Sequence, residues 1–463
     1  MTVKHLSVIK NITLGILLSC FFTASDIHFG TNLSWVKVPP KERFEDVKEF
    51  PWMATESFRT YLEDDDNRVS DAFPVTKYYY PTVHFWFLIY TQFESNQIVI
   101  HDKVNLNLIY KVLDFSNLEH KGLNRNTLYI LQQKLSDERV DKIKKNLKKL
   151  AQDPYSLEPY AKGIYRSIKE AKIVLPLKKA PRQAFFNDLH DNMRTQTGQR
   201  NYIKDGIIRS LPYRLFLHKY FTEKNLPIEL LAIPFLESSF NPLAESKVAA
   251  TGPWQFMPLI ASFFVPKKST TIDYRSNVGT ISVAGAFLMK ENFNILKSWD
   301  LAVTAYNSGT KHLLRTRREL LKTDKIINLE SVIKNSDSGH FGFASKNFYS
   351  EFLALVHALA YEEELFSGLH RQDRYNVEEV LDFYLTKCSL RLDKALSKEQ
   401  LEDVRYHNHQ LKNSTQTLPR ASIINSKEVL PSNRFMRLEF NHLLNSKPKD
   451  WFKYLRNQSC STR

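Results

Sequence analysis

The chain is poor in cysteine: Cys20, Cys388 and Cys460 are the only three among its 463 residues. No cluster of cysteine and histidine has the spacing of a metal site, so neither a metal nor another cofactor is expected. The sequence also shows no tandem repeat and no nucleic-acid-binding motif. These absences argue against a zinc-dependent enzyme, a repeat protein and a nucleic-acid-binding protein.

The composition is that of a globular protein with an excess of positive charge. Hydrophobic residues make up 43% and charged residues 25%, and the formal net charge is +15. Such a chain can bury a substantial core, spread over two or three domains. The positive charge favours anionic partners, and both nucleic acid and a cell wall bearing peptide carboxylates qualify. The densest lysine run, at residues 142–149, alternates with apolar residues at helical spacing, so we interpret it as the solvated face of a helix.

The first residues have the pattern of a secretory signal. Lys4 and Lys10 precede an apolar stretch at residues 12–22, which is too short to span a membrane but has the length of a signal-peptide core. We therefore expect an exported protein of the periplasm or cell envelope, with residues 1–25 removed.

Residues 17–20 loosely resemble a lipobox. This makes Cys20 a candidate for an outer-membrane lipid anchor, with ordinary cleavage after Ser25 as the alternative. Once the signal is removed, Cys388 and Cys460 either form a disulfide in an oxidising compartment or remain free.

The segment 226–258 surrounds one carboxylate, Glu237, with apolar residues. Pro227 suits the first turn of a helix, and the apolar residues after it recur at helical spacing. Pro234 falls within that pattern and is expected to kink the helix, with Glu237 near its C-terminus. The helix dipole and the apolar neighbours both disfavour a charged carboxylate there, so we expect a raised pKa. A carboxylic acid that is neutral at neutral pH can donate a proton to a leaving oxygen, which favours a glycosidase.

The residues that follow suit contact with a sugar. Asn241 and Pro242 end the helix, and beyond them come a hydroxyl, a glycine, a flat ring, an amide and a thioether, supplied by Ser246, Gly252, Trp254, Gln255 and Met257. We interpret this mixture as part of a sugar-binding site. The alternative is a solvated glutamate at a helix end beside a tryptophan of the core.

Three separated motifs agree with a known family. The first comprises Glu237, Ser238, Phe240, Pro242, Ala244, Ser246, Ala250, Gly252, Trp254, Gln255, Phe256, Met257 and Pro258. Asp273 with Arg275, and then the run Ala305, Tyr306, Asn307, Ser308 and Gly309, follow in order. Together they resemble the lytic transglycosylases with a soluble-lytic-transglycosylase domain, which are lysozyme-like enzymes of glycoside hydrolase family 23, and among these the membrane-bound lytic murein transglycosylase D type. The resemblance covers about residues 190–360.

The sequence departs from the family pattern at three positions. Ala249 stands where the family usually has glycine, and Pro253 where it has leucine, so the loop before Trp254 is expected to be stiffer. Ala344 replaces the glutamate of a downstream motif, which puts a second polar contact in doubt. Tyr349 and Lys346 could fill part of that role, although ordinary helix packing is the simpler reading.

The resemblance implies a mechanism with a single catalytic carboxylate. Glu237 would protonate the oxygen between N-acetylmuramic acid and N-acetylglucosamine in the glycan strands of peptidoglycan, and would then take the proton of the C6 hydroxyl of the same muramyl sugar. That hydroxyl closes a 1,6-anhydro ring, so no water is required. Intramolecular nucleophiles can reach effective molarities of about 10⁵ M or more, so a second carboxylate is not needed.

The resemblance also implies the other site residues. Tyr306 would hydrogen-bond Glu237 and hold its orientation, and substrate contacts would come from Ser238, Ser246, Gln255, Met257 and Asn307. Independent support for Tyr306 and Asn307 is helical, because Ser298 is a plausible N-cap and Gly309 a natural C-terminal glycine. Asp273 and Arg275 are expected to form a structural ion pair or loop anchor.

The flanking regions are predicted to be accessory. Residues 40–185 read as mixed and mostly helical structure, with an aromatic-rich stretch at 83–90, strands at 97–100 and 108–113, and helices at 125–150 and 160–170. His101 and Asp102 are expected to make turn hydrogen bonds rather than to form a catalytic pair. Residues 366–463 form a small region of unknown role, with elements at 377–396 and 398–407, a polar loop at 413–419 and a terminal helix at 438–455. Leu390–Leu411 lacks the asparagine-proline signature of a LysM repeat.

The sequence therefore predicts a mainly α (α+β) protein with a lysozyme-like catalytic domain and a peptidoglycan lytic transglycosylase activity. One alternative is a goose-type lysozyme-like hydrolase, which would need Glu245 or Asp273 to activate water. The other is a non-catalytic cell-wall-binding protein. Oligomeric state is left open.

Overall fold

The computed structural model describes residues 48–50, 58–119, 123, 125–322, 328–335, 341–368, 380–411, 413, 415–456 and 458–459. The predicted signal segment, Cys20 and Cys460 lie outside these residues. Cys388 is disulfide-bonded, and its partner lies outside them too. Among the described residues, no helix combines the length and the apolar character needed to cross a bilayer.

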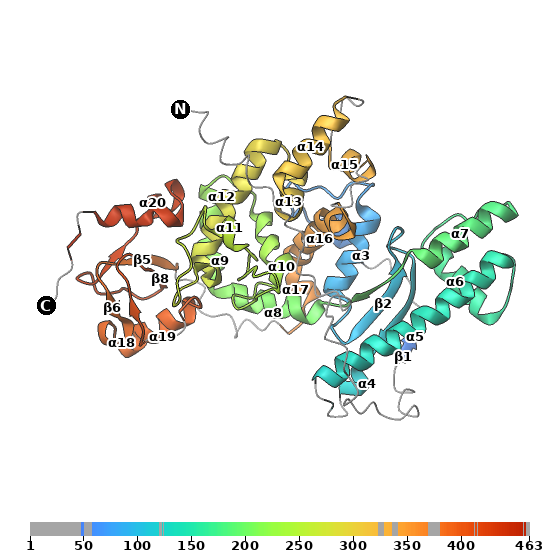
Figure 1. Cartoon of the computed structure of the whole chain (residues 1–463), viewed down its shortest axis with the longest axis horizontal. Helices are drawn as coiled ribbons and strands as arrows, with labels where there is room; N and C mark the ends of the chain where they lie inside the picture. The colour runs from blue at the N-terminus through green and yellow to red at the C-terminus, as the bar shows by residue number, and fades with distance from the viewer. Residues whose placement is uncertain are drawn as a thin grey trace.

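An antiparallel four-stranded sheet lies toward one end of the molecule, between helix α3 (Tyr80–Thr91) and the helices α5–α7 (residues 125–191) at that end (Figure 1). Its order is β1-β3-β2-β4, with β1 at Lys48–Phe50, β2 at Gln97–Asp102, β3 at Ile109–Asp114 and β4 at Met193–Thr197. Because side chains alternate along a strand, the sheet has two apolar faces. Ile98, Ile100 and Leu113 lie in one core cluster, whereas Val99 and Val112 lie in another. The sheet thus joins two cores.

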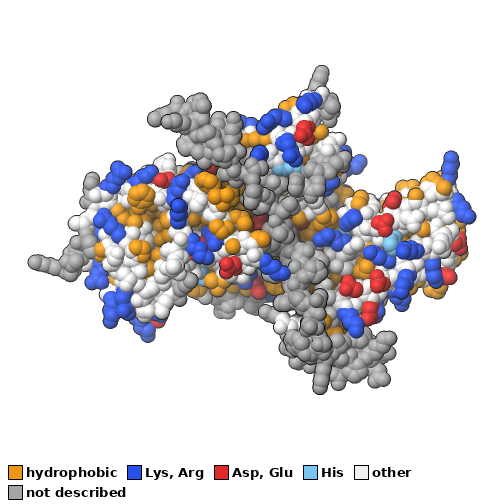
Figure 2. All heavy atoms as spheres, in the orientation of Figure 1, with side chains coloured by type: hydrophobic (Ala, Val, Ile, Leu, Met, Phe, Trp, Pro, Cys, Tyr) orange, Lys and Arg blue, Asp and Glu red, His pale blue; other side chains and the backbone are white. Residues whose placement is uncertain are grey.

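Three helices complete the smaller of these cores. They are α5 (Arg125–Gln152), α6 (Pro159–Glu170) and α7 (Lys179–Asp191). Ile143 and Leu147 of α5 are buried, while Lys142 and Lys145 are exposed, so the lysine run is the solvated face that the sequence predicts. Figure 2 shows Lys and Arg side chains dispersed over both ends of the molecule rather than gathered in one stripe.

The aromatic-rich stretch is a buried helix, α3 (Tyr80–Thr91), that belongs to the larger core. It packs against α16 (Phe343–Ala360), where the indole N–H of Trp86 donates to Asn347 Oδ1 at 3.2 Å. A helix that is apolar on all sides must be covered on all sides. Part of the range 40–185 is therefore packed into the same core as residues 190–360.

The central part of the chain is almost entirely helical. Its elements are α8 (Arg200–Ser210), α9 (Arg214–Glu223), α10 (Ile233–Ser238), α11 (Pro258–Ala261), α12 (Val278–Leu296), α13 (Trp299–Ser308), α14 (Thr310–Leu320), α15 (Leu329–Asn335) and α17 (Glu362–Leu365), with 3-10 helices at Leu211–Tyr213, Ile228–Ala232 and Tyr274–Ser276. Short helices at α2 (Arg59–Glu63) and α4 (Ser116–Glu119) lie in the N-terminal part. The predicted mainly α class, with some β structure, is confirmed.

The C-terminal part contains a three-stranded sheet of order β8-β5-β9, with β5 at Asp382–Thr386, β8 at Ile423–Ser426 and β9 at Phe435–Arg437. Around it lie β6 (Leu390–Arg391), β7 (Thr417–Leu418), α18 (Leu392–Ala395), α19 (Lys398–His407) and α20 (Phe440–Asn445). A capping box between Ser397 and Gln400 explains why α19 begins where the sequence predicts. The single terminal helix predicted at 438–455 is wrong. Pro448 begins a separate 3-10 helix, Pro448–Leu455, because proline disfavours helical backbone at the residue before it.

Buried amides fasten this C-terminal part to the central helices. The side-chain amide of Asn277, at the start of α12, donates to Asn408 Oδ1 at 3.3 Å and to Gln410 Oε1 at 3.0 Å. Asn408 in turn donates to the carbonyl of Asn425 at 2.6 Å. All four side chains are buried, so each lost hydrogen bond would leave a polar group without water.

We expect Asn408→Ala to lower the free energy of unfolding by about 2 kcal/mol, because it removes the side chain that accepts the buried N–H of Asn425 at 2.8 Å and donates to the carbonyl of Asn425 at 2.6 Å. Urea unfolding followed by circular dichroism measures this loss. Because the C-terminal part shares the larger core, the transition should remain single. A variant that unfolds in two steps would contradict the shared core.

Candidate active site

Glu237 lies in the last turn of α10 and is half-buried. The helix ends at Ser239, whose backbone is left-handed at φ 52°. The predicted kink takes another form, because a 3-10 helix at Ile228–Ala232 is followed by a new α-helix in which Pro234 occupies the first turn. Proline is tolerated there, since its missing N–H would have no partner in the helix. The predicted position of Glu237 near a helix C-terminus is nevertheless observed.

The carboxyl group of Glu237 has no polar partner among the residues that the structure describes. Burial raises its pKa from the ordinary value of 4.5 to about 8. The side chain is therefore neutral at pH 7 and carries a proton that it can give away.

The loop from Asn241 to Met257 takes its shape from Arg275. The guanidinium is buried and donates from Nη1 to the carbonyls of Ala249 at 2.5 Å and Phe256 at 3.0 Å. Its other nitrogens bind the Asp273 carboxylate at 3.0 and 2.7 Å, which holds the pKa of that carboxyl below its usual range. This is the loop anchor that the sequence predicts for Asp273 and Arg275.

The loop is dense in left-handed backbone. Phe240, Ala249 and Gln255 have φ values of 58°, 63° and 47°, and Gly252 has φ 79°. A side chain at Gly252 would place its Cβ 1.8 Å from the carbonyl oxygen of Arg275. Ala249 thus holds a conformation that favours glycine, which agrees with the glycine expected there and with a stiffer loop.

Several side chains predicted to contact substrate point into the loop instead. Gln255 is buried, and its amide donates to the carbonyl of Gly252 at 2.8 Å. Ser246 Oγ accepts the N–H of Ala250 at 2.9 Å. Ser238 Oγ, one residue after the acid, donates to the carbonyl of Pro253 at 3.0 Å. In this structure the three polar groups hold the loop in shape around Glu237.

Two aromatic predictions need correction. The Trp254 ring is fully buried, with its indole N–H donating to Ser282 Oγ at 2.9 Å, so it presents no flat surface to a sugar. The Tyr306 hydroxyl, on α13, donates to the carbonyl of Trp254 at 2.5 Å rather than to Glu237. The charge of Glu237 nevertheless contributes to the raised pKa of Tyr306, so the two groups are neighbours. A motif fixes which residues are present, but it does not fix the direction of a hydroxyl.

The remaining predicted residues lie on α13, at the start of α11 and on α16. Asn307 is buried, and its Oδ1 accepts the hydroxyl of Ser345 on α16 at 2.9 Å. Met257 is half-buried at the N-cap of α11. Tyr349 is buried edge-on against Tyr79 with ring centroids 5.3 Å apart, so it has the packing role expected of it.

One carboxyl near Glu237 is absent from the sequence prediction. Glu351, on α16, is 1% exposed, and the charge of Glu237 helps to raise its pKa well above the ordinary range. It belongs to none of the motifs. Its only signal is a glutamate set within the apolar helix sequence 348–356.

His101 and Asp102 make local hydrogen bonds, as expected. Both are buried at the end of β2, where Asp102 Oδ1 accepts the N–H groups of Val104 and Asn105 at 2.9 and 2.6 Å. His101 Nδ1 lies 3.0 Å from the carbonyl of Asp102. Burial lowers the pKa of His101 to about 3, so the imidazole is neutral.

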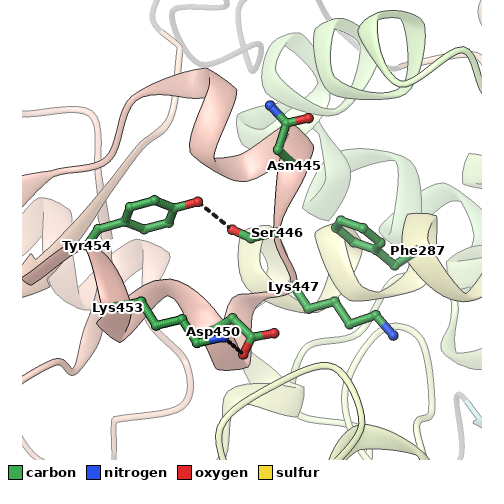
Figure 3. Close-up of a pocket in the computed structure, with 7 residues that line it drawn as sticks. All are labelled: Phe287, Asn445, Ser446, Lys447, Asp450, Lys453 and Tyr454. Atoms are coloured by element: carbon green, nitrogen blue, oxygen red, sulfur yellow. Dashed lines mark hydrogen bonds and ion pairs between the residues drawn. The ribbon is translucent and has the colours of Figure 1, made fainter. Parts of the chain in front are cut away.

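Two pockets lie elsewhere and do not include Glu237. The pocket in Figure 3, of about 420 Å³, lies between α12 and residues 445–454. Its polar side chains pair with one another: Lys453 binds Asp450 at 2.8 Å, and the hydroxyls of Ser446 and Tyr454 lie 3.1 Å apart. A groove of about 930 Å³ is lined by residues of α2 and α3 together with His357.

Comparison with known proteins places a family domain over this site. Residues 216–328 match the family described as "Transglycosylase SLT domain". "Membrane-bound lytic murein transglycosylase D" of Escherichia coli strain K12, and the same protein of E. coli O6:H1, are each 31% identical over 128 residues. A protein of Alteromonas sp. strain M-1 named for tributyltin chloride resistance is 34% identical over 132 residues, or 28% of this chain and 61% of that protein. The match spans 27% of this chain and 27% of each E. coli protein. This chain therefore spans about a quarter of the length of the E. coli proteins that it matches.

We expect Glu237→Gln to stabilise the fold in a pH-dependent way. Because the folded state binds the Glu237 proton more tightly than the unfolded chain, the stability from Glu237 is full below about pH 4.5 and is lost as the pH rises through 8. Glutamine has no proton to lose. Calorimetry should show the variant close to the wild type at pH 4 and more stable by roughly 2–4 kcal/mol above pH 8. The control is Glu245→Gln, at an exposed position in the same loop. If Glu237→Gln raised the stability equally at pH 4 and above pH 8, the raised pKa of Glu237 would be contradicted.

A matched pair of glycines tests the loop. Gly309→Ala adds a Cβ with no atom within 4 Å at φ 81° and ψ 137°, so it should cost about 1–3 kcal/mol of backbone strain alone. Gly252→Ala adds strain at φ 79° and also a clash with the Arg275 carbonyl, so we expect a larger loss, above about 3 kcal/mol. Denaturant unfolding of both variants gives the comparison. Equal losses would mean that the loop can move away from Arg275.

Proposed function

We propose that this chain, which carries a transglycosylase SLT domain, is a peptidoglycan lytic transglycosylase. Its substrate is the β-1,4 bond between N-acetylmuramic acid and N-acetylglucosamine, and its products end in 1,6-anhydromuramic acid. The observation that carries the proposal is Glu237, a carboxylic acid held neutral by burial within the matched domain.

Glu237 acts first as acid and then as base. It gives its proton to the glycosidic oxygen as the bond from that oxygen to the muramyl C1 breaks, which leaves a Glu237 carboxylate and a positively charged sugar that its own N-acetyl group can assist. The C6 hydroxyl oxygen of the same sugar then bonds to C1, and its proton passes to Glu237. The acid is restored, and no water is consumed.

The surroundings of Glu237 favour this route over hydrolysis. A hydrolase needs a second carboxylate to activate water. Of the two candidates in the sequence, Asp273 is bound to Arg275 and Lys268 at 2.7 and 3.3 Å, and Glu245 is exposed on the loop surface. Glu351 is 1% exposed and burial raises its pKa, which disfavours the ionised form that a base must have. A wall-binding protein would have no use for a buried acid, whose ionisation opposes folding.

The roles of the other site residues follow from their contacts. Tyr306 fixes the Trp254 carbonyl, and Ser238, Ser246 and Gln255 hold the loop, so we assign these four to shaping the cleft. Met257 and Asn307 complete its edge, and Met257 in particular is open enough to touch a sugar.

The place of action proposed is the cell envelope. The predicted signal segment supports export, and a disulfide at Cys388 suits an oxidising compartment. The partner is then peptidoglycan, whose peptide carboxylates suit a chain with a net charge of +15. Attachment through a lipid on Cys20 is the anchored form of this proposal, and mass spectrometry of Cys20 in membrane extracts tests it.

Muropeptide mass spectrometry tests the reaction. Mature protein incubated with purified sacculi should release fragments lighter by one water than hydrolysis products, with anhydromuramic ends and no reducing ends. Glu237→Gln keeps the size of the side chain but has no acidic proton, so we expect it to lower the rate at least about 100-fold. The wild-type rate should fall as the pH rises through about 8, where Glu237 ionises. Reducing ends would establish a hydrolase, and no release from several wall types would favour a binding protein.

A further inference from the structure

Glu351 lies on the side of α16 that faces the site. Earlier on this helix, Ser345 bonds to Asn307, and the ring of Phe348 stacks on Tyr306 at 6.5 Å with an interplanar angle of 9°. Glu351 follows Phe348 by three residues, which places it on a neighbouring part of the same helix surface. Helix α16 also packs directly against α10, the helix that carries Glu237.

The carboxyl of Glu351 is buried, and among the described residues no hydrogen bond to Oε2 offsets the cost of removing it from water. The residue is 1% exposed. Three charged or titratable groups surround it: Glu237 from α10, Tyr90 from α3 and Arg194 from β4. The buried Tyr90 hydroxyl also lacks a partner. A buried carboxyl in native proteins is nearly always bonded, so an orphan of this kind calls for a function.

We propose that Glu351 is a positioning residue for Glu237: a carboxylic acid that keeps its own proton throughout the reaction and donates a hydrogen bond to the Glu237 carboxylate formed on proton transfer. The inference rests on the proposed function, because it concerns the same acid. Ala344 stands where the family has a glutamate, and Glu351 lies about two helical turns further along α16. The proposal therefore gives α16 a polar contact with the site from a different position.

The order of ionisation supports the direction of this bond. Two neighbouring carboxyls cannot readily both ionise, and the group in the more apolar place keeps its proton longer. Glu351 is 1% exposed, whereas Glu237 is half-buried, so Glu351 lies in the more apolar place. Burial and the charge of Glu237 both raise the pKa of Glu351, with Arg194 acting in the opposite sense. Glu351 is therefore the group that keeps its proton when one of the two ionises, and a neutral carboxyl can donate to a carboxylate.

Such a contact would act in the reaction rather than in the resting enzyme. No hydrogen bond joins the Glu237 and Glu351 carboxyls in this structure. When the Glu237 proton moves to the glycosidic oxygen, the negative charge that develops gains a donor across the α10–α16 interface. No bond to hydrogen in Glu351 breaks, and the contact is lost again when Glu237 takes the C6 hydroxyl proton. Donors that act only where charge develops increase the rate.

Two substitutions separate this role from packing. Glu351→Leu keeps an apolar filling but removes the donor, so the Glu237 anion is less stable and its pKa rises. We expect kcat on soluble glycan strands to fall about tenfold with KM unchanged, and the alkaline limb of the kcat/KM profile to move up by about one pH unit. Glu351→Gln retains N–H donors and should restore both quantities to near the wild-type values.

The control is Asn347→Leu, one turn earlier on α16, which breaks the buried hydrogen bond to Trp86 instead. It should lower the melting temperature and leave the alkaline limb in place. An alkaline limb that moves to lower pH in Glu351→Gln would mean that Glu351 is ionised, and would overturn the proposal. So would a Glu351→Leu enzyme whose only change is in melting temperature.

A substrate-free measurement keeps this inference apart from the proposed function. In protein labelled with ¹³C at glutamate carboxyls, the Glu237 signal is identified by its loss in Glu237→Gln, and its titration is followed in the Glu351 variants. A titration that moves up in Glu351→Leu but not in Glu351→Gln supports the pair even if sacculi release nothing. Anhydro products from the wild type together with an unmoved Glu237 titration would refute the pair and leave the transglycosylase in place.

Discussion

The buried guanidinium of Arg275 is the contact on which the site depends. It binds the carbonyls of Ala249, in the middle of the loop, and of Phe256, near its end, and is held in turn by Asp273. These two hydrogen bonds fix the backbone on both sides of Gly252 and Gln255, whose φ values are positive. Strained backbone persists where the surrounding contacts hold it in place in this way. The Trp254 and Pro253 carbonyls then lie where Tyr306 and Ser238 can donate to them. Glu237 is thus surrounded by backbone that cannot easily move.

Burial of Glu237 opposes stability and serves chemistry. A carboxyl whose pKa is raised to about 8 destabilises the folded state at neutral pH relative to a group that stays neutral. The extensive core, to which α12, α13 and α16 contribute many buried apolar side chains, offsets this loss of stability. A rigid and costly site of this kind is typical of catalytic rather than binding surfaces.

The flanking regions contribute to that core instead of standing apart from it. Helix α3 from the N-terminal part packs on α16, and the amides of Asn408 and Gln410 from the C-terminal part reach Asn277 at the start of α12. Only the face of the sheet that contacts α5–α7 has a separate core. The central helices, which carry Glu237, Tyr306 and Glu351, are therefore packed against both the N-terminal and the C-terminal part. A movement of either part would shift the helices that form the site.

Much of this could be predicted from the sequence, because it depends on local spacing and on a long motif. Apolar periodicity predicted α5, α6 and α19, and the motif around Glu237 predicted the acid, its helix end and the Asp273–Arg275 anchor. Directions of side chains were decided by tertiary packing. Trp254 turns inward because Ser282 of α12 offers it a partner, and Glu351 lies near Glu237 only because α16 packs on α10. A sequence pattern shows which side chains lie on one helix, strand or loop. Contacts between residues more than 100 positions apart, such as Glu237 and Glu351, form only when the chain has folded.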